Sequence, residues 1–453
     1  MRKGGQDGRR HSIPGARTRQ GRTARCKRTS HAVRILQHNS RRILQACFSS
    51  RDFLLLFFYR TAHARAAAMF RKYFMEVVMG EITLGSLFDG IGGFPYAASF
   101  FGIRTLWASE IMGDCISITR RHFPGMEHVG DITLLHGGRL PPVDIVTFGS
   151  PCQGLSLAGK RLGLADARSG LFLEAARVIY EMKEATHGRY PRFALWENVP
   201  GALYSAGGHD FKAVLETLTE GEIPMPRSGK WANAGMVRGG GTDVAWCVYD
   251  AQYFGTAQRR RRVFLVMDFG GRCAGEILFI PKSLRGYFEA GGTPGQGASV
   301  YAGGGTGRAG SGGGSLNGNG AGDDRVYCIV GNTIGRQPWN GAHGLGCQRE
   351  LSYTLTTVDR HAVTAPAMVQ CSQSGRNRLT ETGYGARRLT PLECERLQGF
   401  PDNWTRYRHD GKEVGDTRRY EMLGNSIAVP CAAYIMQGMC QALAGDDRHG
   451  VSG

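Results

Sequence analysis

The 453-residue chain contains 42% hydrophobic and 21% charged residues, an ordinary globular composition that excludes a wholly disordered protein. Its net charge of +18 lies almost entirely in residues 1–72, which hold 18 lysines and arginines against two acids. The rest of the chain, with 38 basic and 36 acidic residues, is nearly neutral, so bulk charge alone does not mark it as a nucleic-acid binder. The length allows two domains, or one large domain with an insertion.

Membrane-spanning and metal-stabilised classes are also disfavoured. No apolar run approaches the roughly 20 residues that a membrane helix needs, and the best candidate, Phe53–Tyr59, has seven. The twelve cysteines include no Cys-x-x-Cys pair and no Cys/His cluster typical of zinc. We therefore expect a cytoplasmic protein with reduced cysteines, no metal and no membrane segment.

Residues 1–78 lack any hydrophobic periodicity. Their basic, acid-poor composition fits three interpretations: sequence translated from a start codon chosen too early, a basic nucleic-acid arm, or a targeting segment. We favour the first, because Met69, Met75 and Met79 all lie just before the first ordered pattern. We expect this extension to be disordered or absent from the native protein.

From Glu81 onward, strand-like and helical stretches alternate. The expected strands are Ile82–Phe88, Thr105–Ser109, Val143–Phe148, Phe193–Glu197, Trp246–Ala251 and Val263–Asp268, and the clearest helices are Gly170–Ala185 and Phe211–Glu220. This alternation predicts an α/β fold with a doubly wound, mostly parallel sheet.

A second region follows a glycine-rich insert. Residues 291–322 hold 15 glycines in 32 positions, too flexible a composition to build a core. Enrichment in β-formers from Val326 to Val369, notably Tyr353–Val358, predicts short antiparallel strands. Thr390, followed by Pro and then by Glu at the third helical position, predicts the start of a helix. A last helix is expected from about Val429 to Leu443.

The first candidate motif is the turn Phe88-Asp89-Gly90-Ile91-Gly92-Gly93, directly after an expected strand. Glycines let the backbone approach a cofactor closely, and the following helix offers free N–H groups. A purely structural turn is an equally open interpretation. The spacing differs from the Gly-x-Gly-x-x-Gly pattern of dinucleotide-binding turns, which disfavours NAD.

Two acids follow the turn. Glu110 ends the next strand, where an acid can hydrogen-bond ribose hydroxyls, and Asp131 is a candidate for a contact to an adenine amino group. An isolated acid in a loop is usually solvated, but the ordered series of glycine turn and two acids favours a binding site.

Reactive side chains are expected near three further strands. Cys152 lies on a tight loop after an apolar strand, where α/β sheets place their chemistry, and its thiolate would be a strong nucleophile. Glu197 follows another strand and is a candidate general acid. Arg260 and Arg262 stand two residues apart at a strand start and project to one side. The structural alternatives are a buried core cysteine, a carboxylate cap and a solvated arginine face.

Taken in order, these motifs resemble the DNA (cytosine-5)-methyltransferase family over residues 82–443. Pro-Cys, Glu-Asn-Val and Gln-x-Arg-x-Arg in this order are very specific. The matching pieces are Phe88–Gly93, Glu110, Asp131, Ser150–Gln153, Glu197–Val199, Gln258–Arg262, Arg388–Trp404 and Gly424–Ser426. The resemblance implies the Rossmann-like fold of methyltransferases that use S-adenosylmethionine.

The resemblance implies S-adenosyl-L-methionine as the cofactor, with Phe88 near the adenine and glycines along the methionine side. The implied cofactor-binding residues are Phe88, Gly90, Gly92, Gly93, Glu110, Asp131, Pro151, Asn425 and Ser426. Ser86 is a departure, because many relatives carry an acid at this position. A polar contact to the cofactor's amino group is therefore expected to be weaker here.

The implied reaction follows from the chemistry of cytosine, whose C5 is a poor nucleophile. Attack of the Cys152 thiolate at C6 would make C5 nucleophilic, and Glu197 would hold N3 and the exocyclic amine. Arg262 would hold the base O2, with Arg260 near the thiolate and the phosphate. Because a stacked base is out of reach, the cytosine must be flipped out of the duplex.

The family's organisation implies a target recognition region that reads bases in the major groove. We expect a catalytic and cofactor-binding domain, a smaller, irregular, β-rich target recognition domain that includes the insert 291–322, and a C-terminal segment that returns to the catalytic domain, at residues 79–270, 271–420 and 421–445. Candidate DNA-contacting side chains are Arg325, Asn332, Arg336, Gln337, Arg349, Asp359, Arg360 and His361. The implied partner is double-stranded DNA; we expect a monomer, and a cognate restriction endonuclease is an open possibility.

Two alternatives remain. A tRNA-directed relative would share the catalytic motifs, but such relatives carry a Cys-Phe-Thr sequence that this chain lacks. A catalytically dead DNA-binding relative is disfavoured, because all the reacting residues are present.

We predict that a protein beginning at Met79 folds and is active, since an unpatterned, strongly charged segment cannot offset the entropy of ordering it. The check is DNA affinity over a salt series for the full-length and shortened proteins, with turnover measured in parallel. An arm that touches phosphates steepens the fall of affinity with salt by about 0.9 per contact. A clearly shallower slope in the shortened protein, with lost activity at moderate salt, would contradict the prediction.

Overall fold

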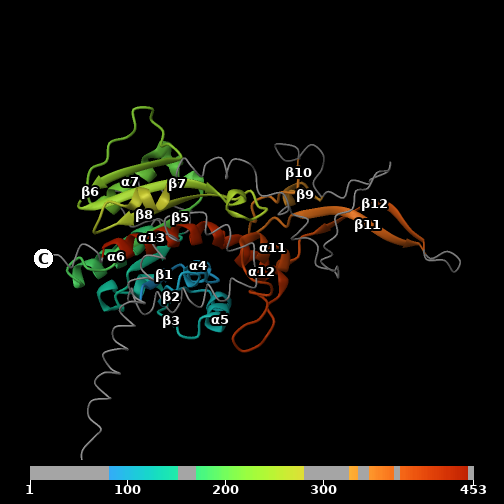
Figure 1. The fold of residues 1–453 in the computed structure, drawn as a ribbon, viewed down its shortest axis with the longest axis horizontal. Helices are drawn as coiled ribbons and strands as arrows, with labels where there is room; N and C mark the ends of the chain where they lie inside the picture. Colours follow the sequence, from blue (N-terminus) through green and yellow to red (C-terminus); the bar gives the residue numbers. More distant parts are fainter. Residues whose placement is uncertain (1–80, 151–169, 280–325, 335–345, 372–377, 447–453) are drawn as a thin grey trace, which may run out of the picture. The chain divides into compact units, whose positions relative to one another are not determined.

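The computed structural model describes residues 81–150, 170–279, 326–334, 346–371 and 378–446. Within these ranges the larger sheet has eight strands in the order β3-β2-β1-β4-β5-β8-β7-β6 (Figure 1). Neighbours from β3 to β5 pair in parallel, whereas β8, β7 and β6 add antiparallel. The predicted α/β, mostly parallel sheet is thus confirmed. The strands are β1 (Thr83–Leu87), β2 (Arg104–Ser109), β3 (Glu127–His128), β4 (Ile145–Phe148), β5 (Phe193–Asn198), β6 (Ala234–Gly239), β7 (Thr242–Asp250) and β8 (Arg261–Asp268).

Both faces of this sheet are buried under helices, so its central strands are apolar on both sides. Adjacent residues of one strand enter different cores: Leu195 packs in the first core and Trp196 in the second, as the two-residue period of a strand requires. The first core also contains apolar side chains of α4 (Gly93–Ser99), α5 (Gly113–His122), α8 (Ala274–Leu278) and α13 (Val429–Asp446). The second contains those of α6 (Gly170–Ala185) and α7 (His209–Thr219).

The carboxyl ends of the parallel strands define where chemistry can occur. The strand order reverses between β1 and β4, which pair with Leu87 opposite Phe148. Open α/β sheets bind ligands outside the strand ends at such a switch point. The glycine-rich turn directly follows β1, Glu110 directly follows β2, and Gly149 directly follows β4.

A smaller antiparallel sheet has the order β10-β9-β11-β12, and its β11–β12 pair forms the long hairpin drawn in orange in Figure 1. Its strands are β9 (Tyr327–Ile329), β10 (Cys347–Arg349), β11 (Ala362–Cys371) and β12 (Arg378–Arg388). The expected strand at Tyr353–Val358 is wrong. Just before this stretch, Ser352 makes an isolated bridge to Gln258. The backbone at Thr356 instead packs on Gly424, where a Cβ would lie 2.5 Å from the Thr356 carbonyl carbon.

The C-terminal helices pack on the first core. The predicted start at Thr390 is confirmed: α11 (Pro391–Gln398) begins with a complete capping box between Thr390 and Glu393. Helix α12 (Asp416–Asn425), which the sequence did not predict, precedes α13. Between α11 and α12, Trp404 donates from its indole to the Ile91 carbonyl at 2.8 Å. This contact joins the C-terminal part of the chain to the glycine-rich turn.

Within the described ranges, no single helix is long and apolar enough to cross a membrane, whereas α12 and α13 reach that length and composition together as a pair bent by 41°. The domain boundaries expected at 271 and 420 stay a prediction. The extension 1–78 and the insert 291–322 lie outside the described residues.

Candidate active site

The glycine-rich turn reverses the chain at the end of β1 by using backbone conformations that favour glycine. Gly90 and Gly92 have φ of +57° and +80°, in the left-handed region. Gly93 allows close packing, because a Cβ there would lie 2.7 Å from the Ile427 side chain. Phe88, with φ of 55°, adopts the same region at a steric cost. The turn therefore exposes backbone at the sheet edge and fits closely against the C-terminal segment.

Glu110 fixes this turn from the neighbouring strand. One carboxylate oxygen accepts a hydrogen bond from the Gly90 amide at 2.8 Å. The other accepts from the amides of Ile111 and Met112, each at 2.8 Å. The carboxylate thus joins the ends of β1 and β2.

Two further acids lie near this edge. Asp131 caps a short turn by accepting from the Thr133 amide at 3.0 Å. Asp89, which the sequence reasoning did not single out, is buried and accepts from the Ser86 hydroxyl at 2.7 Å. Ser86 therefore contacts an acid three residues away. The sequence signal for this contact is a serine and an aspartate three residues apart at a sharp turn.

The backbone that leads into the Pro-Cys motif is held by β5. Trp196 donates from its indole to the Ser150 hydroxyl at 3.0 Å, and the Asn198 amide donates to the Ser150 carbonyl at 3.2 Å. Pro151 and Cys152 themselves lie outside the described residues. Trp196 and Asn198 thus hold the backbone at Ser150; sequence reasoning gave them no such contact, although Asn198 belongs to a recognised motif.

Glu197 and Arg262 form an ion pair because of the antiparallel register of β5 and β8. Glu197 lies opposite Phe264, so the start of β8 meets the end of β5. The Arg262 guanidinium lies 3.1 Å from the Glu197 carboxylate, and both side chains are largely buried. Burial raises the pKa of Glu197, although Arg262 and Arg260 oppose this shift. A carboxyl that retains its proton more readily than usual is suited to donating it.

Arg260 is turned into the protein and makes contacts that the sequence did not predict. Its guanidinium donates to the carbonyls of Leu355 at 3.0 Å and Gly424 at 3.1 Å, and also to that of Ser426. The side chain is only 2% exposed, and burial holds the pKa of Arg260 well below its usual value. It ties β8 to two distant segments of the chain.

One cavity of about 510 Å³ brings most of the predicted residues together. Gly92 is not among its lining residues, since its Cα faces Phe123 and Thr119, where a Cβ would meet the Phe123 ring at 2.9 Å. The predicted residues that line the cavity are Phe88, Gly90, Gly93, Glu110, Asp131, Glu197, Arg260, Arg262, Asn425 and Ser426.

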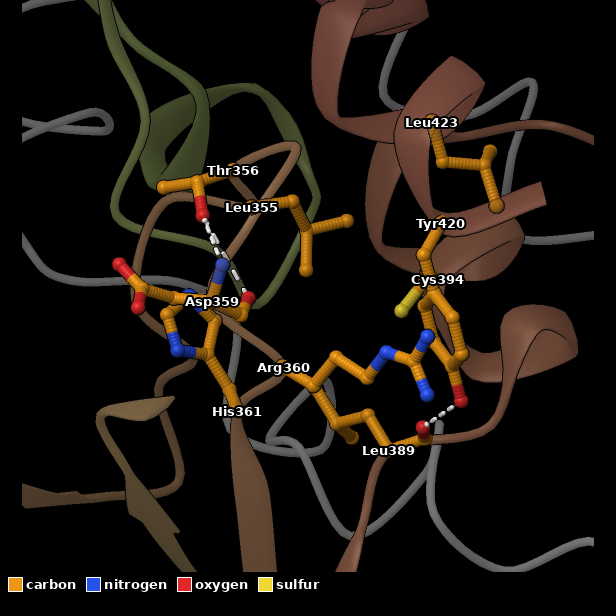
Figure 2. A pocket seen from close by; sticks show the side chains of 9 residues that line it. All are labelled: Leu355, Thr356, Asp359, Arg360, His361, Leu389, Cys394, Tyr420 and Leu423. Atoms are coloured by element: carbon orange, nitrogen blue, oxygen red, sulfur yellow. Dashed lines mark hydrogen bonds between the residues drawn. The ribbon is translucent and has the colours of Figure 1, made fainter. Parts of the chain in front are cut away.

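The candidate DNA-contacting residues differ in accessibility. His361 is 2% exposed; its Nδ1 accepts from the Gly331 amide at 2.8 Å, and its Nε2 lies 2.7 Å from the Thr354 carbonyl. The expectation that His361 contacts DNA is therefore wrong, because both ring nitrogens are occupied by backbone. Arg360 is exposed, but its guanidinium lies over the Tyr420 ring (Figure 2). Arg325, Arg336 and Gln337 lie outside the described residues.

Comparison with known proteins identifies the family. The model for the C-5 cytosine-specific DNA methylase family matches residues 82–268 and 334–441. The chain belongs to this family. A "Type II methyltransferase M1.ScrFI" of Lactococcus lactis subsp. cremoris is 28% identical over 79% of this chain and 77% of its own.

Two further proteins are similar to this chain. A "DNA N-6-adenine-methyltransferase" of Escherichia phage P1 is 27% identical over 81% of this chain, which spans 62% of the phage protein's length. The solved structure of Entamoeba histolytica methyltransferase EhMeth shares the fold with a TM-score of 0.51 at 15% identity, covering 80% of this chain and 99% of its own. In the part of this methylase-family chain that the structure describes, no group of His, Cys, Asp and Glu side chains is arranged to hold a metal ion.

We predict that Arg260→Met destabilises the fold by more than about 3 kcal/mol, because it leaves three carbonyls without their donor. Denaturant unfolding provides the measurement. Arg261→Met is the matched control, since the neighbouring Arg261 side chain is exposed. Equal stabilities of the two variants would contradict the assigned role.

Proposed function

We propose that this protein transfers a methyl group from S-adenosylmethionine to C5 of a flipped-out cytosine in double-stranded DNA. The observation that carries the proposal is that one cavity joins the glycine-rich turn and Glu110 to the Glu197–Arg262 pair. The end formed by the glycine-rich turn and Glu110 has the features of a nucleoside cofactor site. The other end has Glu197 as a proton donor and Arg262 as a cation, which together suit a pyrimidine.

The residues present fit the cofactor. A cavity of about 510 Å³ is within the range of small-molecule sites, and S-adenosylmethionine supplies a methyl group on a sulfonium centre when bound. Phe88 offers an aromatic face, and Glu110 and Asp131 offer acceptors for ribose hydroxyls and an adenine amine. Asn425 and Ser426 close the cavity from the end of α12, with Gly93 packed beneath them. Gly90, Gly92 and Pro151 complete the proposed cofactor-binding set.

The proposed chemistry divides between three side chains. The Cys152 thiolate adds to C6 of the base, which makes C5 nucleophilic. Glu197 donates its proton to N3, so the negative charge that builds on the ring is neutralised. Arg262 binds the base O2, and its contact with the Glu197 carboxyl keeps both groups aligned. Once C5 has gained the methyl group, a solvent base removes the C5 proton, the C6–S bond breaks to release the thiolate, and N3 returns its proton to Glu197, which restores the base.

The base must leave the duplex to reach this site, and we propose residues 271–420 as the region that recognises the target. Two alternatives concern the substrate: tRNA, and the adenine suggested by the name of the phage P1 relative. The raised pKa of Glu197 fits proton donation to N3 of cytosine, in DNA or in tRNA, whereas methyl transfer to the exocyclic amine of adenine requires no proton on the ring. Labelled methyl transfer to duplex DNA and to tRNA in parallel provides the test. Label in tRNA alone would overturn the DNA proposal.

We predict that Cys152→Ser abolishes methyl transfer and largely preserves DNA binding, because a serine hydroxyl is a far weaker nucleophile than a thiolate. The wild-type protein should also form a trapped adduct with DNA that contains 5-fluorocytosine, since fluorine cannot leave as a proton does. Cys347→Ser, at an exposed cysteine, is the control. Substantial activity in Cys152→Ser would exclude the covalent step.

We predict that Glu197→Gln slows methylation by about 10²- to 10⁴-fold, the usual size of a general acid–base contribution. Single-turnover rates with saturating cofactor measure the effect, and Glu127→Gln, at an exposed position on β3, controls for the loss of a carboxylate. If Glu197→Gln retained a near-normal rate, Glu197 would have only a structural role.

A further inference from the structure

The buried ring of His361, directly before β11, is bound by backbone on both sides. The Gly331 amide donates to its Nδ1 at 2.8 Å, and its Nε2 lies 2.7 Å from the Thr354 carbonyl. An amide N–H can only donate and a carbonyl can only accept, so these partners fix one neutral tautomer, with the proton on Nε2. A protonated ring would turn a second N–H against the Gly331 amide and break that contact.

The two contacts of this ring join segments that lie apart in the sequence. Gly331 lies two residues after the end of β9, and Thr354 is the first residue of the 354–360 loop. The next carbonyl of this loop, that of Leu355, accepts from Arg260 at the start of β8. The imidazole therefore connects β9 to a loop that is itself bound to β8.

Between its anchored ends, the 354–360 loop presents exposed side chains. Val358 is 84% exposed, and Arg360 is exposed as well. The turn is closed by the Asp359 amide, which donates to the Thr356 hydroxyl at 2.8 Å (Figure 2). A loop that is held at its base and exposes a cation at its end is suited to contact a large anionic ligand.

The surroundings of His361 disfavour its protonation. Burial is the main cause that lowers the pKa of His361; the Thr354 hydrogen bond and Asp359 oppose this shift, and Arg388 adds to it. Other groups around the ring keep their charge between about pH 5 and pH 7.5. They are the cation Arg360 and three weak acids whose pKa burial raises, Tyr353, Cys394 and Tyr420.

We propose that His361 is a positioning residue for DNA binding, which in its neutral form holds the 354–360 loop against the small sheet. The inference rests on the proposed function. The loop belongs to the proposed target recognition region, and Arg260 binds it beside the strand that carries Arg262. The described residues that line the cofactor cavity include neither His361 nor Gly331, so loss of their contact should affect DNA and spare the cofactor.

The proposal predicts a pH dependence of definite sign. A histidine released from these contacts has an ordinary pKa of about 6.5, whereas the bound ring titrates lower. The contacts are therefore complete above about pH 6.5 and are lost as the pH falls below it. The KM for DNA should rise as the pH falls from about 7.5 to about 5. An exposed histidine would act in the opposite direction, because its protonation adds positive charge and strengthens DNA binding.

Steady-state methyl transfer to duplex DNA of mixed sequence tests the proposal, with kcat and both KM values measured across this pH range. Neither Gln nor Asn is protonated there. His361→Gln keeps a donor for Thr354, and His361→Asn keeps an acceptor for Gly331. Each should raise the KM for DNA about three- to tenfold at pH 7.5, the usual worth of one hydrogen bond, and remove its pH dependence. The kcat and the KM for S-adenosylmethionine should stay nearly unchanged.

His209→Gln, at an exposed position that begins α7, is the matched control and should behave as the wild type. A wild-type KM for DNA that stays constant or falls with falling pH would overturn the role of His361 while the function stands. A lower kcat with unchanged KM values in both variants would mean that His361 only stabilises the fold, and this too would overturn the inference. If the wild-type protein transfers no methyl group, the proposed function is wrong and the inference falls with it. The wild-type pH series remains decisive if the variants do not fold.

Discussion

The buried guanidinium of Arg260 is the interaction on which the site depends. It comes from the start of β8 and binds carbonyls 95, 164 and 166 residues further along the chain. Removing a guanidinium from water is costly unless its donors find acceptors. The folded state therefore requires the loop at Leu355 and the end of α12 to meet the start of β8.

Because Arg260 joins these segments, the cavity is lined by residues that lie far apart in the sequence. The glycine-rich turn forms its floor at the end of β1, and Asn425 and Ser426 close it from α12. Gly424 and Gly93 lie where any side chain would collide with backbone of the 355–357 loop or with Ile427. Small residues at these two positions let the segments approach closely enough for Arg260 to reach all three carbonyls. One side chain thereby joins β8, the loop at Leu355 and the end of α12.

Sequence reasoning located the elements that depend on local patterns. The turn after β1, the acid at the end of β2 and the capping box at Thr390 are all encoded within a few residues. Arg260 was also identified, but its partners were not, because they lie far along the chain. Tyr353–Val358 has the composition of a strand, yet packing against Gly424 overrides that preference. Likewise, nothing within a few residues of His361 indicates that its ring nitrogens bind the backbone of Gly331 and Thr354. The pairing of Ser86 with Asp89 is local, but a sharp turn was needed to bring the two together.

In the proposed function, the Glu197–Arg262 end of the cavity acts on C5 of cytosine. The most direct measurement is to incubate the full-length protein with S-adenosylmethionine and duplex DNA of mixed sequence, digest the DNA to nucleosides, and identify the methylated product by mass spectrometry with retention standards. We expect 5-methyldeoxycytidine, formed about 10²- to 10⁴-fold more slowly by Glu197→Gln. N6-methyldeoxyadenosine as the product, or 5-methyldeoxycytidine formed equally well by the variant, would contradict the proposal.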